Sequence, residues 1–237
     1  MDIGINAIQA VSSKQAIFIN DKCRVFVIGD LDGDLPALKN ALNNVNFNPE
    51  RDTLFCLGDF VDRGDKTYDL FTYLQAIRAC MILGNHEHLM LESLLSNDKA
   101  AFKLWTDNGG NWHKSVSREK LSVMCDELLT KPLSIVLEYR GYKIGLSHTF
   151  AQSWDWENYP DDKSVIVQSL LWDREVVKQN KVVKSHGVDF TIHGHNSTKA
   201  PFWVGNSYHI DTNYLGGKPT LLELSEVIAS LNKSNAI

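Results

Sequence analysis

The sequence is poor in cysteine, lacks long hydrophobic runs and carries no excess of positive charge. Its four cysteines lie singly among 237 residues, with no CxxC pair, so we expect no disulfide framework. Three of them lie in or beside apolar segments, which indicates reduced thiols in a cytoplasmic protein. No apolar run approaches the roughly 20 residues that a membrane-spanning helix needs. The first residues also lack the basic and apolar segments of a signal peptide.

The charge balance argues against two classes of partner. The net charge is −5 and the sequence pI is about 5.9, so we expect no nucleic-acid partner and no membrane-surface binding. The chain contains no repeat and no low-complexity linker. Its length suits a single domain over residues 1–237, with a core large enough to fold without disulfides. Nothing in the sequence indicates an oligomeric state.

Three apolar segments are each followed by a polar turn and then by a helical pattern. These segments span residues 24–28, 53–57 and 79–83. The first helix is predicted to begin after Asp34, an N-cap residue, with Pro36 in its first turn. Such alternation is typical of a sheet with parallel strands, whose carboxyl ends meet at one edge and bind ligands there.

The rest of the chain follows a different pattern. Residues 88–130 are predicted to be mainly helical, with an interruption at 107–112, and to form a helical side or cap region. A hairpin is predicted from 133 to 147, with its turn at Arg140-Gly141. Residues 149–163 are predicted to be a loop, either a flap near a site or a plain surface loop. Further predictions are an edge strand at 16–19, a helix at 164–171, strands at 188–192, 207–210 and 220–224, and little order in the last dozen residues.

Ligand-type side chains recur directly after the predicted strands. Any one of them fits an ordinary polar loop, but strand ends of one sheet converge, so we expect these groups to meet. Carboxylate and imidazole ligands together suit manganese, zinc or iron. Their number suits two metals about 3.5–4 Å apart that share a carboxylate and a water. The residues concerned are Asp30, Asp32, Asp59, Asp62, Asn85, His86, His148, His193 and His195.

Three short motifs resemble those of one enzyme family. Residues 58–64 (Gly-Asp-Phe-Val-Asp-Arg-Gly) match the GDxVDRG motif of the metal-dependent phosphoprotein phosphatases, and residues 84–87 match their GNHE motif. Residues 29–33 resemble their GDxHG motif with one departure. The chain looks most like the phage-lambda-type bacterial branch of the serine/threonine protein phosphatases, over about residues 16–226. Further segments that fit this branch, in order, are 108–110, 171–175, 194–195 and 210–212.

The resemblance carries expectations for fold and activity. It implies an α/β fold, the calcineurin-like metallophosphatase β-sandwich of two mixed sheets flanked by helices. The strand–loop–helix alternation alone would equally allow an open sheet. The implied activity is hydrolysis of phosphomonoesters, with phosphoserine and phosphothreonine of a phosphorylated protein or peptide as the substrates.

The resemblance also implies a role for each matching residue. Two divalent metals, manganese in the first place and zinc or iron as alternatives, would be bound by carboxylate, amide and imidazole groups. A water that bridges them would attack phosphorus in line. His86 would protonate the leaving oxygen, with Asp62 orienting its ring, while Arg63 and Arg174 would bind the phosphate. The implied ligands are Asp30 and Asp59 for the first metal and Asp59, Asn85, His148 and His195 for the second.

Three positions depart from the motifs. Asp32 stands where the family has a metal-binding histidine, and we expect it to bind the first metal directly or through a water, in a weakened enzyme. Leu83 stands where this branch often has arginine, and Thr149-Phe150 follow His148. Both departures lie near the expected site, so we expect them to affect which substrates the protein accepts. Asp211 is implied to support the site without binding metal. The remaining histidines, His88, His113, His186, His193 and His209, are predicted to be structural.

Two other functions stay open. The first is a diadenosine-tetraphosphate hydrolase of the same superfamily, but that group resembles GDxVARG and GNHD where this chain has Asp62-Arg63 and Glu87. The second is a weakly active or inactive phosphoprotein-binding module, suggested by Asp32. Phosphate release with added manganese separates an enzyme from a binder, and comparing a phosphopeptide with a dinucleotide separates the two enzymes.

Overall fold

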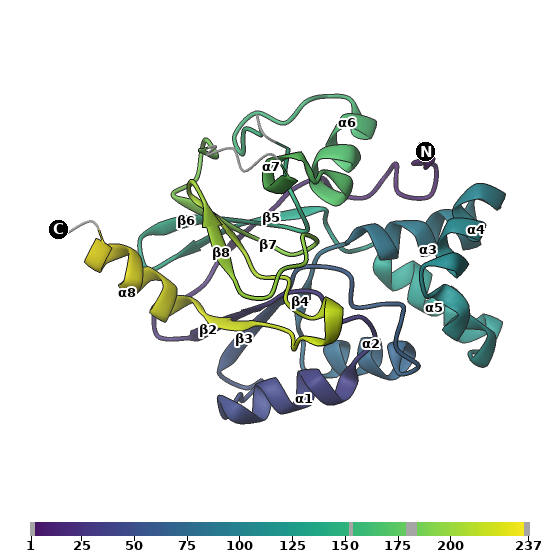
Figure 1. The fold of residues 1–237 in the computed structure, drawn as a ribbon, viewed down its shortest axis with the longest axis horizontal. Coiled ribbons are helices and arrows are strands. Elements are labelled where there is room, and N and C mark those ends of the chain that lie inside the picture. Colours follow the sequence, from purple (N-terminus) through teal and green to yellow (C-terminus); the bar gives the residue numbers. More distant parts are fainter. Residues whose placement is uncertain (1–2, 152–153, 179–183, 235–237) are drawn as a thin grey trace.

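Two mixed β-sheets packed face to face form the centre of the protein, and helices cover them on the outside (Figure 1). The structure is a computed structural model that describes residues 3–151, 154–178 and 184–234. The predicted sandwich of two mixed sheets flanked by helices is thereby confirmed.

The smaller sheet contains the three predicted strand–loop–helix units. Its order is β10 (Leu221–Glu223), β2 (Arg24–Ile28), β3 (Asp52–Cys56) and β4 (Cys80–Met81). The strands β2, β3 and β4 are parallel, and β10 is antiparallel to β2. The carboxyl ends of three strands therefore open toward the same edge, as the alternation predicts.

The larger sheet has six strands. Its order is β1 (Gln15–Phe18), β5 (Ser134–Tyr139), β6 (Tyr142–Ser147), β7 (Phe190–His193), β9 (Ser207–His209) and β8 (Phe202–Val204). The predicted hairpin is β5–β6, and both turn residues, Arg140 and Gly141, have positive φ (52° and 74°). A turn of this kind matches the right-handed twist of the flanking strands. The strands β6, β7 and β9 are parallel, so β6 and β7 also end at a common edge.

The hydrophobic core follows the two-residue period of the strands. Val25 and Val27 of β2 and Phe55 of β3 point between the sheets, where they pack with Leu137 and Leu146 of the larger sheet. Alternate residues of the same strands face outward and pack beneath the helices α1 (Leu35–Asn44) and α2 (Thr67–Ala76). The predicted start of α1 is confirmed, because Asp34 accepts a hydrogen bond from the Ala37 N–H at 2.8 Å.

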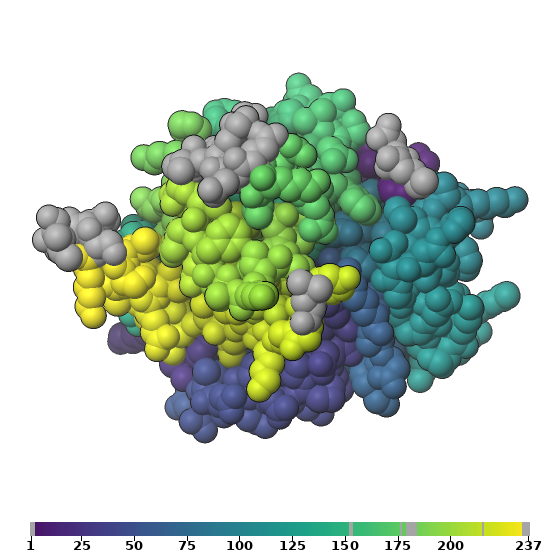
Figure 2. All heavy atoms as spheres, viewed as in Figure 1, coloured from purple at the N-terminus to yellow at the C-terminus, as the bar shows by residue number. Residues whose placement is uncertain are grey.

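The predicted helical side region forms one flank of the molecule, which we call the helical flank (Figures 1 and 2). It consists of α3 (Asn85–Leu95), α4 (Lys99–Asp107), the 3-10 turn η1 (Gly110–Ser115) and α5 (Arg118–Leu128). The remaining helical elements are α6 (Lys163–Val167), η2 (Gln168–Trp172), α7 (Glu175–Lys178), η3 (Tyr214–Gly216) and α8 (Leu224–Ser234). Within the described ranges, no helix is both long and apolar enough to cross a membrane.

Three sequence-based expectations differ from the structure. The last residues form α8 through Ser234, because an apolar stripe with helical spacing, including Val227 and Ile228, packs against the core between the sheets. The described part of loop 149–163 is not the plain surface loop that was one of the two alternatives, since Trp154 and Trp156 are buried in the core. The short strand β8 was not predicted at all.

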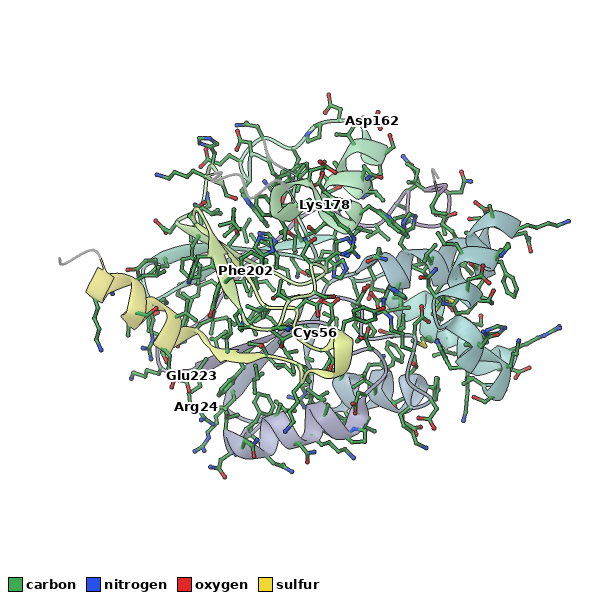
Figure 3. All side chains as sticks on the ribbon, in the orientation of Figure 1. Arg24, Cys56, Asp162, Lys178, Phe202 and Glu223 are labelled. Atoms are coloured by element: carbon green, nitrogen blue, oxygen red, sulfur yellow. The ribbon has the colours of Figure 1, made fainter. Side chains whose placement is uncertain are left out.

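All four cysteines are free, as predicted. Cys56 lies in the middle of the molecule (Figure 3), and Cys125 is also buried. Burial raises the pKa of both thiols. These two residues therefore behave as core hydrophobic groups.

His209 of β9 should make the fold sensitive to acid. Its ring is buried against Phe202, and neither of its ring nitrogens has a hydrogen-bond partner among the described residues. Burial lowers its pKa from 6.5 to about 4. The folded state therefore favours the neutral ring, so the stabilising contribution of His209 is present above pH 6.5 and is lost as the pH falls toward 4.

Between pH 7 and pH 5 the free energy of unfolding should fall in both proteins. We expect the fall to be about 2 kcal/mol smaller in His209→Phe than in the wild type. Urea unfolding at the two pH values measures this difference. His186→Phe, a change at an exposed histidine, should leave the pH dependence of the wild type. Equal acid losses in the wild type and in His209→Phe would contradict the prediction.

Candidate metal centre

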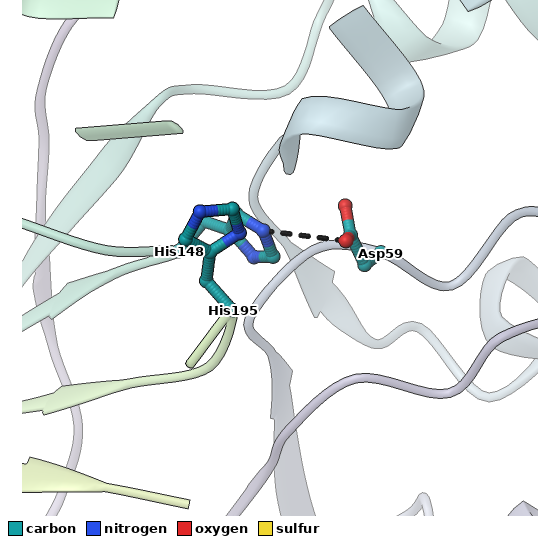
Figure 4. A group of neighbouring side chains, drawn as sticks. All are labelled: Asp59, His148 and His195. Carbon is teal, nitrogen blue, oxygen red and sulfur yellow. Dashed lines mark ion pairs between the residues drawn. The ribbon is translucent and has the colours of Figure 1, made fainter. Parts of the chain in front are cut away.

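The predicted ligands converge at the edge where β3, β6 and β7 end. Asp59 follows β3, His148 follows β6, and His195 lies just beyond β7 (Figure 4). All three side chains are buried, and one ligand atom from each lies within 4.8 Å of the others. Two buried imidazoles and a carboxylate this close form the core of a candidate metal site.

The surroundings of His148 leave a place for a cation. Its Nδ1 lies 2.8 Å from the carbonyl oxygen of Leu57 and donates to it, so a neutral ring has its lone pair on Nε2. That nitrogen lies 2.9 Å from Asn85 Oδ1 and 3.4 Å from Asp59 Oδ2. A cation between these lone pairs satisfies all three groups, while Leu57 fixes the orientation of the imidazole.

His195 is held in the form that binds metals. Its Nε2 is buried and has no hydrogen-bond partner among the described residues. Burial, with the nearby His148 and Arg174, lowers its pKa well below 6.5, so the ring is neutral. A neutral imidazole with a free nitrogen at this position fits a metal ligand.

Two buried carboxylates complete the cluster. Asp30 accepts a hydrogen bond from the His195 N–H at 3.0 Å. Burial and the negative charges of Asp211 and Asp59 raise the pKa of Asp30 well above its usual value. Burial acts in the same direction on Asp59, but His148 and other imidazoles outweigh it and hold that pKa well below the usual value. Carboxylates this close favour a bound cation, and the donor set of oxygens and imidazoles fits a divalent metal.

Both predicted phosphate-binding arginines border the cluster. A cavity of about 330 Å³ opens beside it, lined by Asp30, Asp59, Arg63, Arg174, His195, Ser197 and Tyr214. Arg174 is oriented by its Nη1, which donates to the carbonyl oxygen of His195 at 2.9 Å. The cavity thus places two guanidinium groups next to the candidate ligands.

Asp32 contacts an arginine in this structure. It forms an ion pair with Arg63, and its second carboxylate oxygen lies 3.5 Å from Asn213 Nδ2. Burial raises the pKa of Asp32 to about 6, and the Arg63 charge opposes that rise. Asp32 is absent from the compact group formed by Asp59, His148 and His195.

His86 and Asp62 form the predicted dyad. His86 Nδ1 lies 2.6 Å from Asp62 Oδ2. The other oxygen of Asp62 accepts hydrogen bonds from the indole N–H of Trp105 (2.8 Å) and of Trp112 (2.7 Å). Burial disfavours the charged form of His86, but Asp59 and Asp62 outweigh it and raise the pKa to about 8. The ring is therefore mainly protonated near neutral pH.

The helical flank contributes the parts of the site that the sequence did not predict. Trp105 lies in α4 and Trp112 in η1, more than forty residues after Asp62. Between them, Gly109 adopts a φ of 113°, and its carbonyl accepts from the Arg63 N–H at 3.2 Å. A side chain at Gly109 would lie 2.5 Å from that nitrogen. The segment 108–110 carried the family resemblance, but nothing in it indicated these contacts.

Glu87 organises the loop that follows β3. Its buried carboxylate accepts four backbone N–H groups, from Asp59 (2.8 Å), Phe60 (3.0 Å), Val61 (3.1 Å) and Gly84 (2.7 Å). These bonds fix the turn that carries Asp59 against the start of α3. Glu87 thus positions a candidate ligand without facing the cavity.

The backbone is strained where the predicted site residues lie. Nine non-glycine residues have positive φ among those described. Five of the nine are predicted site residues, namely Asp32, Asp59, Asp62, Arg63 and His195. Such conformations are costly and cluster at functional sites, which supports a functional role for this edge.

Two of the histidines that the sequence predicts to be structural, His88 and His193, form hydrogen bonds away from the candidate ligands. His193 is hydrogen-bonded to Thr191 and Ser147. His88 lies 2.8 Å from the carbonyl oxygen of Gly4. Both imidazoles therefore have hydrogen-bond partners within the fold.

Comparison with known proteins agrees with this geometry. The sequence profile described as "Calcineurin-like phosphoesterase" matches residues 23–199. Serine/threonine-protein phosphatase 2 of Salmonella typhimurium is 29% identical over 199 residues, covering 79% of this chain and 86% of that protein. Serine/threonine-protein phosphatase 1 of the same organism is 28% identical over 207 residues, covering 84% and 91%. The symmetrical bis(5'-nucleosyl)-tetraphosphatase of Pseudomonas syringae is 42% identical, but over 69 residues, 28% of this chain and 24% of that protein.

Solved structures share the fold. A protein serine/threonine phosphatase from Saccharomyces cerevisiae superposes with a TM-score of 0.60 at 15% identity, covering 86% of this chain and 72% of that one. A cold-active protein-tyrosine phosphatase from a Shewanella species gives 0.53 at 13% identity, covering 94% and 81%. The match to the family profile spans most of the chain and includes the candidate ligand cluster, and the chain therefore belongs to the calcineurin-like phosphoesterase family.

Proposed function

We propose that this protein hydrolyses phosphomonoesters, with phosphoserine and phosphothreonine in proteins as its substrates. The observation that carries the proposal is the His86–Asp62 dyad, 2.6 Å apart, beside a cavity that combines metal-ligating groups with two arginines. The two Salmonella relatives named serine/threonine-protein phosphatases, each matching most of the chain, support this substrate class.

The residues have separate roles in this reaction. Arg63 and Arg174 bind the phosphate oxygens, because planar guanidinium groups match them through paired N–H donors. Divalent cations, manganese in the first place and zinc or iron as alternatives, would supply an activated water and would offset negative charge when bound. The residues that would hold them are Asp30, Asp59, Asn85, His148 and His195.

His86 donates a proton to the leaving oxygen. Its pKa of about 8 keeps the ring protonated near neutral pH. Asp62 fixes the ring through Nδ1, which leaves Nε2 as the nitrogen that can donate toward substrate. That nitrogen lies 2.9 Å from Nη2 of Arg63, a residue that lines the cavity, so the ring lies next to the proposed phosphate site.

Asp32 is proposed as a further ligand of the first metal, directly or through a water. It follows β2 in the same turn as Asp30, and its second carboxylate oxygen, which lies 3.5 Å from Asn213 Nδ2, is not the one that accepts from Arg63 Nη1. We expect Asp32→Ala to reduce the content of one metal, measured by elemental analysis after dialysis. Unchanged metal content and unchanged turnover would show that Asp32 is not a ligand.

A second candidate function is hydrolysis of diadenosine tetraphosphate. The match to the Pseudomonas tetraphosphatase favours it, although that match covers 28% of this chain. Steady-state rates on a phosphoserine peptide and on diadenosine tetraphosphate, with manganese present, separate the two. We expect the peptide to be the better substrate by kcat/KM. A preference for the dinucleotide would overturn the proposed function, and no turnover of either would indicate a phosphoprotein-binding module.

Activity should depend on a divalent metal. Oxygen-rich ligand sets favour harder ions than thiolate sites do, so manganese should restore activity best after metal removal. The measurement is hydrolysis of an aryl phosphate before chelation, after chelation and after return of manganese, zinc or iron. Full activity in a protein whose metal content is confirmed as nil would contradict the two-metal site.

The proposed setting is the cytoplasm. All four cysteines are free in the structure, although Cys23 and Cys80 are partly exposed. Free thiols of this kind persist in reducing compartments. A phosphorylated cytoplasmic protein is therefore the partner that we propose.

A further inference from the structure

The guanidinium of Arg63 has a neighbouring group on three sides, of which the Asp32 carboxylate is the one with opposite charge. Its Nη1 donates to Asp32 Oδ1, its Nη2 lies 2.9 Å from His86 Nε2, and its central carbon lies 5.3 Å from the centre of the Tyr214 ring. The side chain is 34% exposed, so it still borders the cavity. The group proposed to bind the substrate phosphate is therefore already bound to a carboxylate of the chain.

Asp32 is held beside Arg63 by the backbone. The Asp32 N–H donates to the carbonyl oxygen of Asp59 (3.0 Å), and its own carbonyl accepts from the Gly64 N–H (2.9 Å). Asp59 and Gly64 begin and end the loop that carries Arg63. The Asp32 side chain is 11% exposed, so solvent screens the ion pair less than it would at an open surface. The turn that carries Asp32 is thus hydrogen-bonded to both ends of the loop that carries Arg63.

A carboxylate and a phosphate bind a guanidinium group in the same way. Both are anions that bind it through directed N–H bonds. We propose that Asp32 is an internal competitor of the substrate phosphate for Arg63 and thereby lowers the affinity of the site for phosphate. This inference rests on the proposed function. A neutral histidine, the residue type of the motif that this segment resembles, has no negative charge with which to compete.

The test removes the charge of Asp32 and keeps its size. We expect Asp32→Asn to lower the dissociation constant for inorganic phosphate about tenfold, because tenfold corresponds to about 1.4 kcal/mol, close to the value of one hydrogen bond to a charged group. Calorimetry at saturating manganese measures this constant without turnover. Asp34→Asn is the matched control, because Asp34 caps α1 and asparagine caps a helix equally well.

A double-mutant cycle shows whether the effect acts through Arg63. Asp32→Asn should change the phosphate affinity in the wild type but not in an Arg63→Ala background. Any of three results would overturn the inference. They are an equal gain of phosphate affinity in both backgrounds, an unchanged or weaker affinity in Asp32→Asn, and no phosphate binding by the wild type or by Asp32→Asn.

Two further readings keep the roles of Asp32 apart. Metal content is measured on the same samples. A loss of metal together with weaker phosphate binding would show that Asp32 is a metal ligand and would contradict its role as a competitor for Arg63. A protein that binds phosphate as expected but hydrolyses no phosphomonoester would contradict the proposed function and leave the competition intact.

Discussion

His86→Asn should slow hydrolysis of a phosphoserine peptide about 10²–10⁴-fold, the usual value of general acid catalysis. A serine alkoxide is a poor leaving group and needs the proton of His86, which the Asp62 and Asp59 carboxylates keep on the ring at neutral pH. A nitrophenyl phosphate needs little protonation and should lose much less. The measurement is kcat on both substrates.

Metal binding should survive this substitution. The candidate ligand Asp59 accepts a hydrogen bond from the backbone N–H of residue 86 (3.0 Å), which asparagine retains. His113→Asn is the control, since His113 stacks on Trp105 of the flank but does not reach the cavity. Equal losses on good and poor leaving groups, at full metal content, would refute the acid role.

Glu87→Gln should destabilise the protein by about 3 kcal/mol, because it leaves buried N–H groups unpaired. Each oxygen of Glu87 accepts two backbone donors: Asp59 and Gly84 on one, Phe60 and Val61 on the other. An amide NH₂ in place of either oxygen accepts nothing and faces two donors. For a chain of this length the melting temperature should fall by roughly 6–12 °C.

Glu92→Gln is a matched control on the same helix. Glu92 is equally buried, but its carboxylate accepts one backbone N–H, from Ala7 at 2.7 Å, through a single oxygen. The amide can keep that bond, so we expect a clearly smaller loss of stability. Thermal unfolding of both variants decides the matter, and equal losses would show that the four bonds to Glu87 are not the cause.

Much of the fold was predictable because the strands leave strong local signals. The predicted strand at 24–28 coincides with β2, and the hairpin turn at Arg140-Gly141 lies where it was expected. Local signals also placed the candidate ligands, since a polar residue directly after a buried strand must lie at the sheet edge. The apolar spacing of α8 was present in the sequence as well, but its packing partner is the core between two sheets, which no local pattern reveals.

The contacts that complete the site depend on segments distant in sequence. No spacing rule connects Trp105 or Trp112 with Asp62, because their meeting requires the helical flank to pack against the loop after β3. The same limit applies to Asp32. The motif it departs from suggested a metal, whereas the cation that the structure places beside it is Arg63, thirty-one residues away.

The two indole bonds to Asp62 make the order of assembly matter. One oxygen of this carboxylate depends on donors that lie 43 and 50 residues further along the chain. The sheet of β2, β3 and β4 can pair before those residues have folded, but Asp62 then lacks both donors. During refolding, competence for catalysis should therefore appear together with the burial of these tryptophans and later than the pairing of the strands. Docking of the helical flank thus completes the hydrogen bonds of Asp62, and with them the proposed His86–Asp62 dyad.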